Sequence, residues 1–84
     1  MKTTEEGGSR YEPIPCAVYS TYELAILRRR DLRLLWREGS VYYRLPVTPL
    51  DLETRAGEEF LHCRLPSGSR ARLRLDYILR ADPI

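Results

Sequence analysis

The sequence predicts an α+β fold in which one short helix precedes a small antiparallel β-barrel. Apolar residues follow helical spacing up to about residue 30, and they then alternate with a period of two as far as Pro83. Turn-forming residues divide this second part into four or five short strands. The chain has 84 residues, 43% of them hydrophobic, and a chain of this length buries only about 60% of its unfolded surface. We therefore expect one domain with one small core and little room for a deep substrate cleft.

The first ten residues differ in composition from the rest of the chain. After Met1 they contain no apolar residue, and Thr, Glu, Gly and Ser predominate. Such a segment cannot bury enough apolar surface to offset the entropy of ordering. We expect a disordered tail over residues 1–10 and a single folded domain over residues 11–84. The tail also lacks the apolar stretch of an export signal, which predicts a cytoplasmic protein.

An extended arm and a helix are expected to open the domain. Two prolines disfavour helical geometry over residues 11–16. Ser20 is followed three residues later by Glu23, the spacing of a capping box, in which the two side chains satisfy the first free backbone N–H groups of a helix. This spacing predicts a helix over residues 21–29. The apolar stripe expected on it consists of Leu24, Ala25, Ile26 and Leu27.

Two alternating segments predict a hairpin as the first part of the sheet. Leucine and tryptophan alternate with their neighbours over residues 32–37, and the same period returns over residues 41–47. Glu38 and Gly39 lie between the two segments and predict the turn. Prolines in the second segment cannot donate ladder hydrogen bonds, so we expect this strand to bulge or end near Leu45.

The remaining chain predicts further short strands. Residues 51–55 are expected to form an edge strand, followed by a turn and a strand over residues 60–65. A second turn, rich in Pro, Ser and Gly, comes next. Residues 70–75 then alternate strictly, with alanine and leucine on one face and arginine on the other. The final strand is expected to end by Pro83.

Short strands leave exposed edges unless the sheet closes on itself. A small barrel removes these edges, and Sm-like, SH3-like and OB barrels all fit the predicted order of elements. A helix ahead of the first strand favours the Sm-like form. The fold prediction is therefore α+β, a small Sm-like antiparallel β-barrel with an N-terminal helix.

The sequence offers little for catalysis, for a metal or for a membrane. Two cysteines and one histidine are too few for a four-ligand zinc site at paired spacings. His62 and Cys63 are neighbours on a predicted strand and face opposite sides, so they cannot form a catalytic pair. No glycine-rich phosphate loop or His-based triad occurs, and no apolar run approaches the roughly 20 residues of a membrane span. We expect no enzyme activity, cofactor, metal, small-molecule substrate or membrane partner.

Arginine supplies all but one of the 14 basic residues, in a chain of formal net charge +2. Its planar guanidinium suits phosphates. One candidate function is therefore direct RNA binding, in which arginines contact phosphates and Trp36, Tyr42 or Tyr43 stack on bases. The structural alternative is a solvated strand face and a favourable helix C-terminus. The arginine candidates are Arg28, Arg29, Arg30, Arg70, Arg72 and Arg74.

Three segments follow one another in an order that resembles a known family. They are residues 11–25 (Y-x-P-I-x-C-x-x-Y-x-x-x-E-L-A), 34–39 (LLWREG) and 73–78 (LRLDYI). Each segment is weakly specific by itself, but the shared order is similar to that of the Rof-type Rho-binding antiterminators. These are small bacterial inhibitors of the transcription terminator Rho.

The resemblance implies an Sm-like barrel without catalytic activity that binds the N-terminal RNA-binding domain of Rho and blocks its RNA site. Carboxylates presented to a basic RNA site compete with RNA phosphates for the same positive electrostatic potential. The family carries acidic residues where this chain has Ala17, Val18 and Ser20, so apolar and aromatic neighbours enter the expected surface. The structural alternative is that the glutamate caps the helix and the tyrosines pack against the barrel. The Rho-binding candidates are Glu23, Glu12, Tyr19, Tyr22 and Val18.

Overall fold

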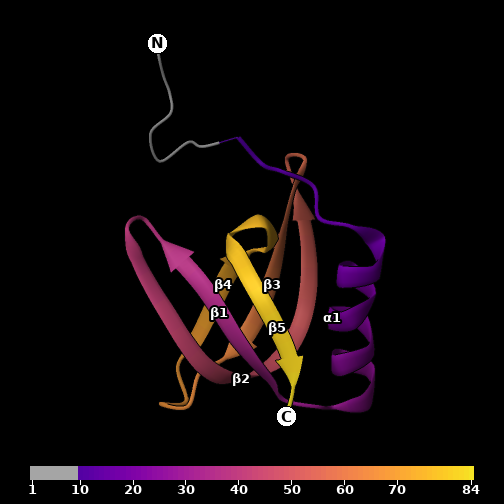
Figure 1. Cartoon of the computed structure of the whole chain (residues 1–84). Helices are drawn as coiled ribbons and strands as arrows, with labels where there is room; N and C mark the ends of the chain where they lie inside the picture. Colours follow the sequence, from indigo (N-terminus) through magenta and orange to yellow (C-terminus); the bar gives the residue numbers. More distant parts are fainter. Residues whose placement is uncertain (1–9) are drawn as a thin grey trace.

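The computed structural model describes residues 10–84 and contains one helix and one five-stranded antiparallel sheet (Figure 1). The expected α+β class is confirmed. The expectation of a disordered tail over residues 1–10 falls almost wholly outside the described residues. The elements are α1 (Cys16–Arg28), β1 (Leu32–Glu38), β2 (Val41–Arg55), β3 (Glu58–Arg64), β4 (Arg70–Arg74), the 3-10 turn η2 (Leu75–Tyr77) and β5 (Ile78–Pro83).

The sheet has the strand order β4-β3-β2-β1-β5, so β4 and β5 lie at its two ends. Strand β2 joins the two halves, because residues 41–47 pair with β1 and residues 48–55 pair with β3. A register shift between Pro49 and Asp51 marks a bulge. Figure 1 shows β2 curving from one half to the other with α1 beside it. The sheet curves strongly, but it is not closed into a barrel.

The long β2 corrects the expectation that a strand ends near Leu45 and a separate edge strand covers residues 51–55. Both regions belong to β2, which runs through Pro46 and Pro49. A proline is tolerated in a strand where its nitrogen does not have to donate to a neighbour. Each half of β2 pairs with one neighbouring strand only, so such positions recur along it.

The predicted turns mostly hold. The β2–β3 hairpin turns at Ala56 and Gly57, which both have positive φ, as the twist of a two-residue hairpin loop favours. The first hairpin turns at Gly39 and Ser40, one residue later than expected, because Glu38 still pairs with Val41. Residues 75–77, expected to continue a strand, form η2 instead.

The period-two alternation of the sequence builds the core as expected. Leu32, Leu34 and Trp36 on β1 are buried, while Arg33 between them is exposed. The helix adds two side chains to the same cluster. The remaining members of the cluster come from β2, β3, β4, η2 and β5. The complete cluster comprises Tyr22, Ala25, Leu32, Leu34, Trp36, Val47, Leu61, Cys63, Leu73, Leu75 and Ile78.

The helix begins at Cys16, five residues earlier than the capping box predicts. Pro15 occupies the N-cap with φ −60° and ψ 147°, and its carbonyl accepts hydrogen bonds from the N–H groups of Val18 and Tyr19 at 3.0 and 3.1 Å. Ser20 therefore lies inside the helix and caps nothing. A proline's fixed φ and missing N–H suit the beginning of a helix, so the last proline of the arm is also the place where the helix starts.

The helix ends at Arg28, and the C-cap residue that follows, Arg29, is left-handed with a φ of 56° and a ψ of 45°. This conformation lets the N–H groups of Arg29 and Arg30 bond to the carbonyls of Ile26 and Ala25 at 3.2 and 2.9 Å. Glycine usually occupies this position, because a side chain with a Cβ pays a steric cost there.

We predict that Arg29→Gly raises the free energy of unfolding by about 0.5–1 kcal/mol, because glycine adopts positive φ without this steric cost. Urea denaturation followed by circular dichroism measures the change. The matched control is Arg28→Gly, which lies within α1 and should lower stability by about 1 kcal/mol. Equal effects of the two substitutions would contradict the assignment of strain to residue 29.

Candidate functional site

A pair of charged residues holds the N-terminal arm against the sheet. The Arg74 guanidinium, at the end of β4, donates from Nε and Nη2 to the two carboxylate oxygens of Asp76 at 2.7 and 2.6 Å. The same Nη2 donates to the Arg10 carbonyl at 3.0 Å, and the Glu12 N–H donates to Asp76 Oδ2 at 3.0 Å. We call Arg74 and Asp76, with these two backbone groups, the arm clamp.

Tyr11 adds a second layer of contacts to the arm clamp. Its hydroxyl donates to Glu59 Oε1 at 2.9 Å, and the Arg74 guanidinium lies 5.6 Å from the centre of its ring. The guanidinium lies 4.3 Å from the Tyr77 ring, and its Nη1 is 3.7 Å from Glu58. The hydrogen bond between Tyr11 and Glu59 thus attaches the arm to β3 as well.

The burial of Arg74 corrects the expectation of a solvated strand face. Its side chain is only 8% exposed, whereas Arg70 and Arg72 on the same strand are exposed. Alternation along a strand predicts which side chains share a face, but it does not show what covers that face. Here the arm covers the outer face at residue 74, so this arginine is not available to bind RNA.

The arm clamp shifts the ionisation of its own members. Burial alone would raise the pKa of Asp76, but the hydrogen bonds from Arg74 and from the Glu12 N–H, with the charge of Arg74, outweigh burial and hold that pKa below its usual value. The hydrogen bond to Asp76 likewise raises the pKa of Arg74. Both groups are therefore charged at neutral pH.

We predict that Asp76→Asn lowers the free energy of unfolding by about 3 kcal/mol, because it leaves a buried guanidinium without its carboxylate. The matched control is Asp82→Asn. Asp82 also accepts from an arginine two residues before it, Arg80, at 2.7 Å, but both side chains are largely exposed. Its loss should cost less than about 1 kcal/mol. Equal losses in urea melts would contradict the arm clamp.

Acid should remove the same contribution. The folded-state pKa of Asp76 lies below its unfolded value of about 3.9, so its stabilising effect is complete above that pH and is lost as pH falls through the folded-state pKa. The difference in stability between the native protein and Asp76→Asn should shrink below about pH 4. A stability difference that stays constant down to pH 2 would show that ionisation of Asp76 does not stabilise the fold.

The structure separates the Rho-binding candidates into exposed and buried residues. Glu12, Val18 and Glu23 are exposed, and Tyr19 is half-buried. Tyr22 is 1% exposed and belongs to the core, where burial raises its pKa to about 12. It therefore offers no surface to a partner, as the structural alternative proposed.

The outer surface of α1 is more apolar than the sequence suggests. Leu24 and Leu27, expected to face the core, are 45% and 78% exposed, and Val18 is exposed as well. Four consecutive residues span about 300° around a helix and cannot share one face, and Tyr22 and Ala25 take the inward positions. The outer surface of α1 thus combines exposed leucines with the exposed Glu23 carboxylate.

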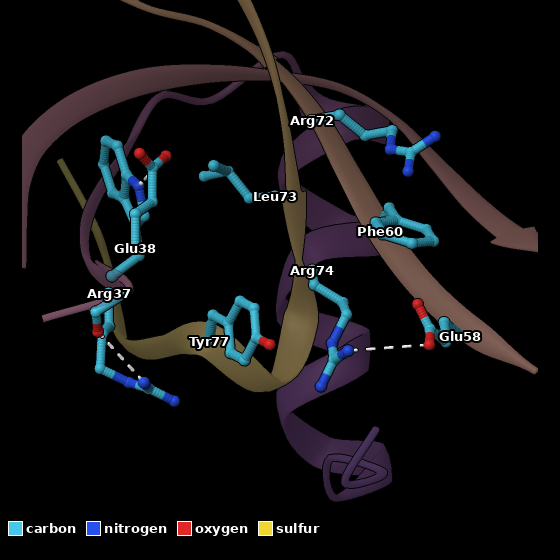
Figure 2. A pocket seen from close by; sticks show the side chains of 10 residues that line it. Arg37, Glu38, Glu58, Phe60, Arg72, Leu73, Arg74 and Tyr77 are labelled. Atoms are coloured by element: carbon cyan, nitrogen blue, oxygen red, sulfur yellow. Dashed lines mark hydrogen bonds and ion pairs between the residues drawn. The ribbon is translucent and has the colours of Figure 1, made fainter. Parts of the chain in front are cut away.

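The arginine candidates do not form one surface. Arg28, Arg29 and Arg30 lie at the C-terminal end of α1, where Arg28 and Arg30 border an apolar hollow of about 300 Å³. Arg72 lies on β4, and borders a larger groove of about 570 Å³ (Figure 2). Sequence reasoning missed most of this groove, since its walls come from four separate elements. Its lining residues are Trp36, Arg37, Glu38, Gly39, Glu58, Phe60, Arg72, Leu73, Arg74 and Tyr77.

His62 and Cys63 face different environments, as their adjacent positions predict. His62 Nε2 lies 2.6 Å from Glu53 Oε1, and this hydrogen bond lowers the pKa of the glutamate. Cys63 is fully buried, and burial raises its pKa to about 11. Cys16 is free and exposed at the start of α1. Within residues 10–84 no group of three or more potential metal ligands comes together.

We predict that the two thiols react at very different rates. Cys16 should react with a chromogenic disulfide reagent in the native protein, because it is exposed. Cys63 should react only after denaturation, because it is buried and its raised pKa keeps it a thiol rather than the reactive thiolate. Absorbance should report one fast thiol without urea and two with it. Two fast thiols in the native protein would contradict the buried position of Cys63.

The comparisons with known proteins establish the fold alone. No family model matches the chain, and no curated protein matches it. Proteasome accessory factor B/C (PafBC) of Arthrobacter aurescens has a similar structure, with a TM-score of 0.76 and 21% identity over 89% of this chain. The match covers 12% of the PafBC chain, so this chain resembles a small part of that protein. In the described part of the chain, no helix is long and apolar enough to cross a membrane.

Proposed function

We propose that this protein is a non-enzymatic inhibitor of Rho-dependent transcription termination that binds the N-terminal RNA-binding domain of Rho. The observation that carries the proposal is the arm clamp. The first and last segments that resemble the Rof-type family, residues 11–25 and 73–78, lie far apart in the sequence, yet they meet through the Glu12–Asp76 contact and the stacking of Arg74 on Tyr11. The two segments therefore occur in the same chain for a physical reason, which is that they contact each other in the folded protein.

The clamp gives these segments a role in presenting a binding surface. It fixes the arm, and the arm leads directly into α1 at Pro15. Glu12, Val18 and Glu23 are then exposed on one continuous stretch of chain, with Tyr19 half-buried among them. Carboxylates on this stretch would face the basic RNA site of Rho, and the exposed apolar side chains would add contact area.

The finer fold and location belong to the same proposal. An Sm-like form of the sheet is supported by the helix ahead of the first strand, by the strong curvature of β2 and by the short antiparallel strands that follow. Inhibition by occupying the RNA site of Rho requires no cofactor and no metal. An inhibitor of Rho acts where Rho acts, in the cytoplasm.

Charge reversal of Glu23 tests the proposal. We predict that Glu23→Lys weakens binding to purified Rho at least about 30-fold, which corresponds to about 2 kcal/mol, because it adds repulsion to the loss of a charged contact. Glu23→Gln should have a smaller effect. Biolayer interferometry with immobilised Rho measures the affinities.

Two controls make this test specific. Glu38→Lys applies the same charge reversal at the β1–β2 turn, away from α1, and should leave Rho binding within about twofold of the native protein. Arg72→Gln on β4 should also leave it nearly unchanged. If Arg72→Gln abolishes Rho binding while Glu23→Lys preserves it, the helix-centred surface is wrong.

A further inference from the structure

None of the residues that line the groove of about 570 Å³ is a Rho-binding candidate. Trp36, Arg37 and Glu38 at the end of β1 form one wall, and Phe60 on β3 with Arg72 on β4 forms the other. Figure 2 shows Arg37 and Arg72 on opposite sides of the β4 ribbon, with Tyr77 and Arg74 near one end. Its volume lies within the range of about 300–1,000 Å³ that is typical of ligand sites.

Two of the three guanidiniums in the groove are available for an anion. Arg74 shares its charge with Asp76 and Glu58. Among residues 10–84, neither Arg37 nor Arg72 forms an ion pair with a carboxylate. The Glu38 carboxylate, which also lines the groove, accepts a hydrogen bond from Trp36 Nε1 at 3.1 Å. The charge of Arg72 contributes to lowering the pKa of Glu53, but both guanidiniums keep donors that no carboxylate of the described residues occupies at ion-pair distance.

The same two arginines lie over aromatic rings. The Arg72 guanidinium lies 4.1 Å from the centre of the Phe60 ring, and the Arg37 guanidinium lies 5.0 Å from that of Tyr77. Arg37 also donates to the Gly39 carbonyl at 3.2 Å, which fixes its position further. A guanidinium held by a ring on one face can stack on a nucleobase with the other face and donate to phosphate with its edge.

Two exposed tyrosines lie on the β1–β2 hairpin, paired with the groove residues Arg37 and Trp36. Tyr42 pairs across the strands with Arg37 and is 60% exposed. Tyr43 stacks on Trp36 with ring centres 5.4 Å apart, and part of it is exposed. The hairpin thus offers an exposed ring opposite the groove arginine Arg37, and this combination of rings and positive charge is typical of surfaces that bind single strands.

We propose that this groove binds single-stranded nucleic acid, with Arg37 and Arg72 each contacting a phosphate and stacking on a base. The inference does not rest on Rho binding, since it uses other residues and needs no partner protein. It also differs from binding by arginines in general, because Arg28, Arg29 and Arg30 lie outside the groove and Arg74 is occupied by the arm clamp.

Fluorescence anisotropy of labelled oligonucleotides, measured without Rho, tests the proposal. The probes are 12-nucleotide oligouridylate and oligodeoxythymidylate, which separate RNA from DNA as the source of the strand, and a DNA duplex of equal length. We expect the full chain to bind at least one single strand more tightly than the duplex. Arg37→Gln and Arg72→Gln should each weaken this binding at least about fivefold, which is about 1 kcal/mol. Each should also reduce the slope of log affinity against log salt by about 0.7.

Two further sets of variants separate a built site from general attraction. Arg28→Gln removes one positive charge from α1, outside the groove, and should change the affinity by less than about twofold. Arg37→Lys and Arg72→Lys keep the charge but lose the flat guanidinium, so they should bind more weakly than the native protein. Circular dichroism melts confirm that every variant is folded.

Several results would overturn the proposal. They are no binding of either single strand, an equal loss on Arg28→Gln, and full retention of affinity in both lysine variants. Poly-glutamate serves as a competitor that carries charge without bases. If it displaces the oligonucleotide and binds as tightly, the groove is a site for acidic peptides and the nucleic-acid assignment is wrong.

Discussion

The ion pair between Arg74 and Asp76 is the constraint on which the arrangement of the molecule depends. Both side chains are less than a tenth exposed, and removing two charges from water is favourable only if the remaining donors and acceptors are also satisfied. Part of that satisfaction comes from the backbone of the arm, through the Arg10 carbonyl and the Glu12 N–H. An arm that detached would leave buried charged groups short of partners. The arm and the sheet are therefore expected to fold and unfold as one unit.

This constraint also decides where the helix lies. The arm reaches α1 within a few residues of the clamp, and Pro15 turns the chain into the helix at that point. Tyr22 and Ala25 then reach the core, so Leu24 and Leu27 face outward. The exposed surface of α1 is thus the side opposite the two residues that enter the core.

The sequence was sufficient for the features that depend on local pattern. Alternation placed Leu32, Leu34 and Trp36 in the core, and the order of elements predicted an α+β fold. It was insufficient where a distant segment decides the outcome. The burial of Arg74 depends on an arm more than 60 residues away, and the passage of β2 through Pro46 depends on which neighbour each half of the strand has. The groove was missed for the same reason, because Arg37, Phe60 and Tyr77 come together only after folding.

The clamp further divides the arginines of this small protein by function. The Arg74 guanidinium contacts the arm and also lines the groove, but it forms ion pairs with Asp76 and Glu58. Arg37 and Arg72 lie beyond it, along the groove. Glu12 and Glu23 lie on the arm and on α1. Neither region carries charge of one sign, because Glu38 and Glu58 also line the groove and three arginines stand at the end of the helix. The two proposed binding functions therefore use separate sets of residues, carboxylates and apolar side chains of the arm and helix for a basic protein site, and Arg37 and Arg72 for a phosphate backbone.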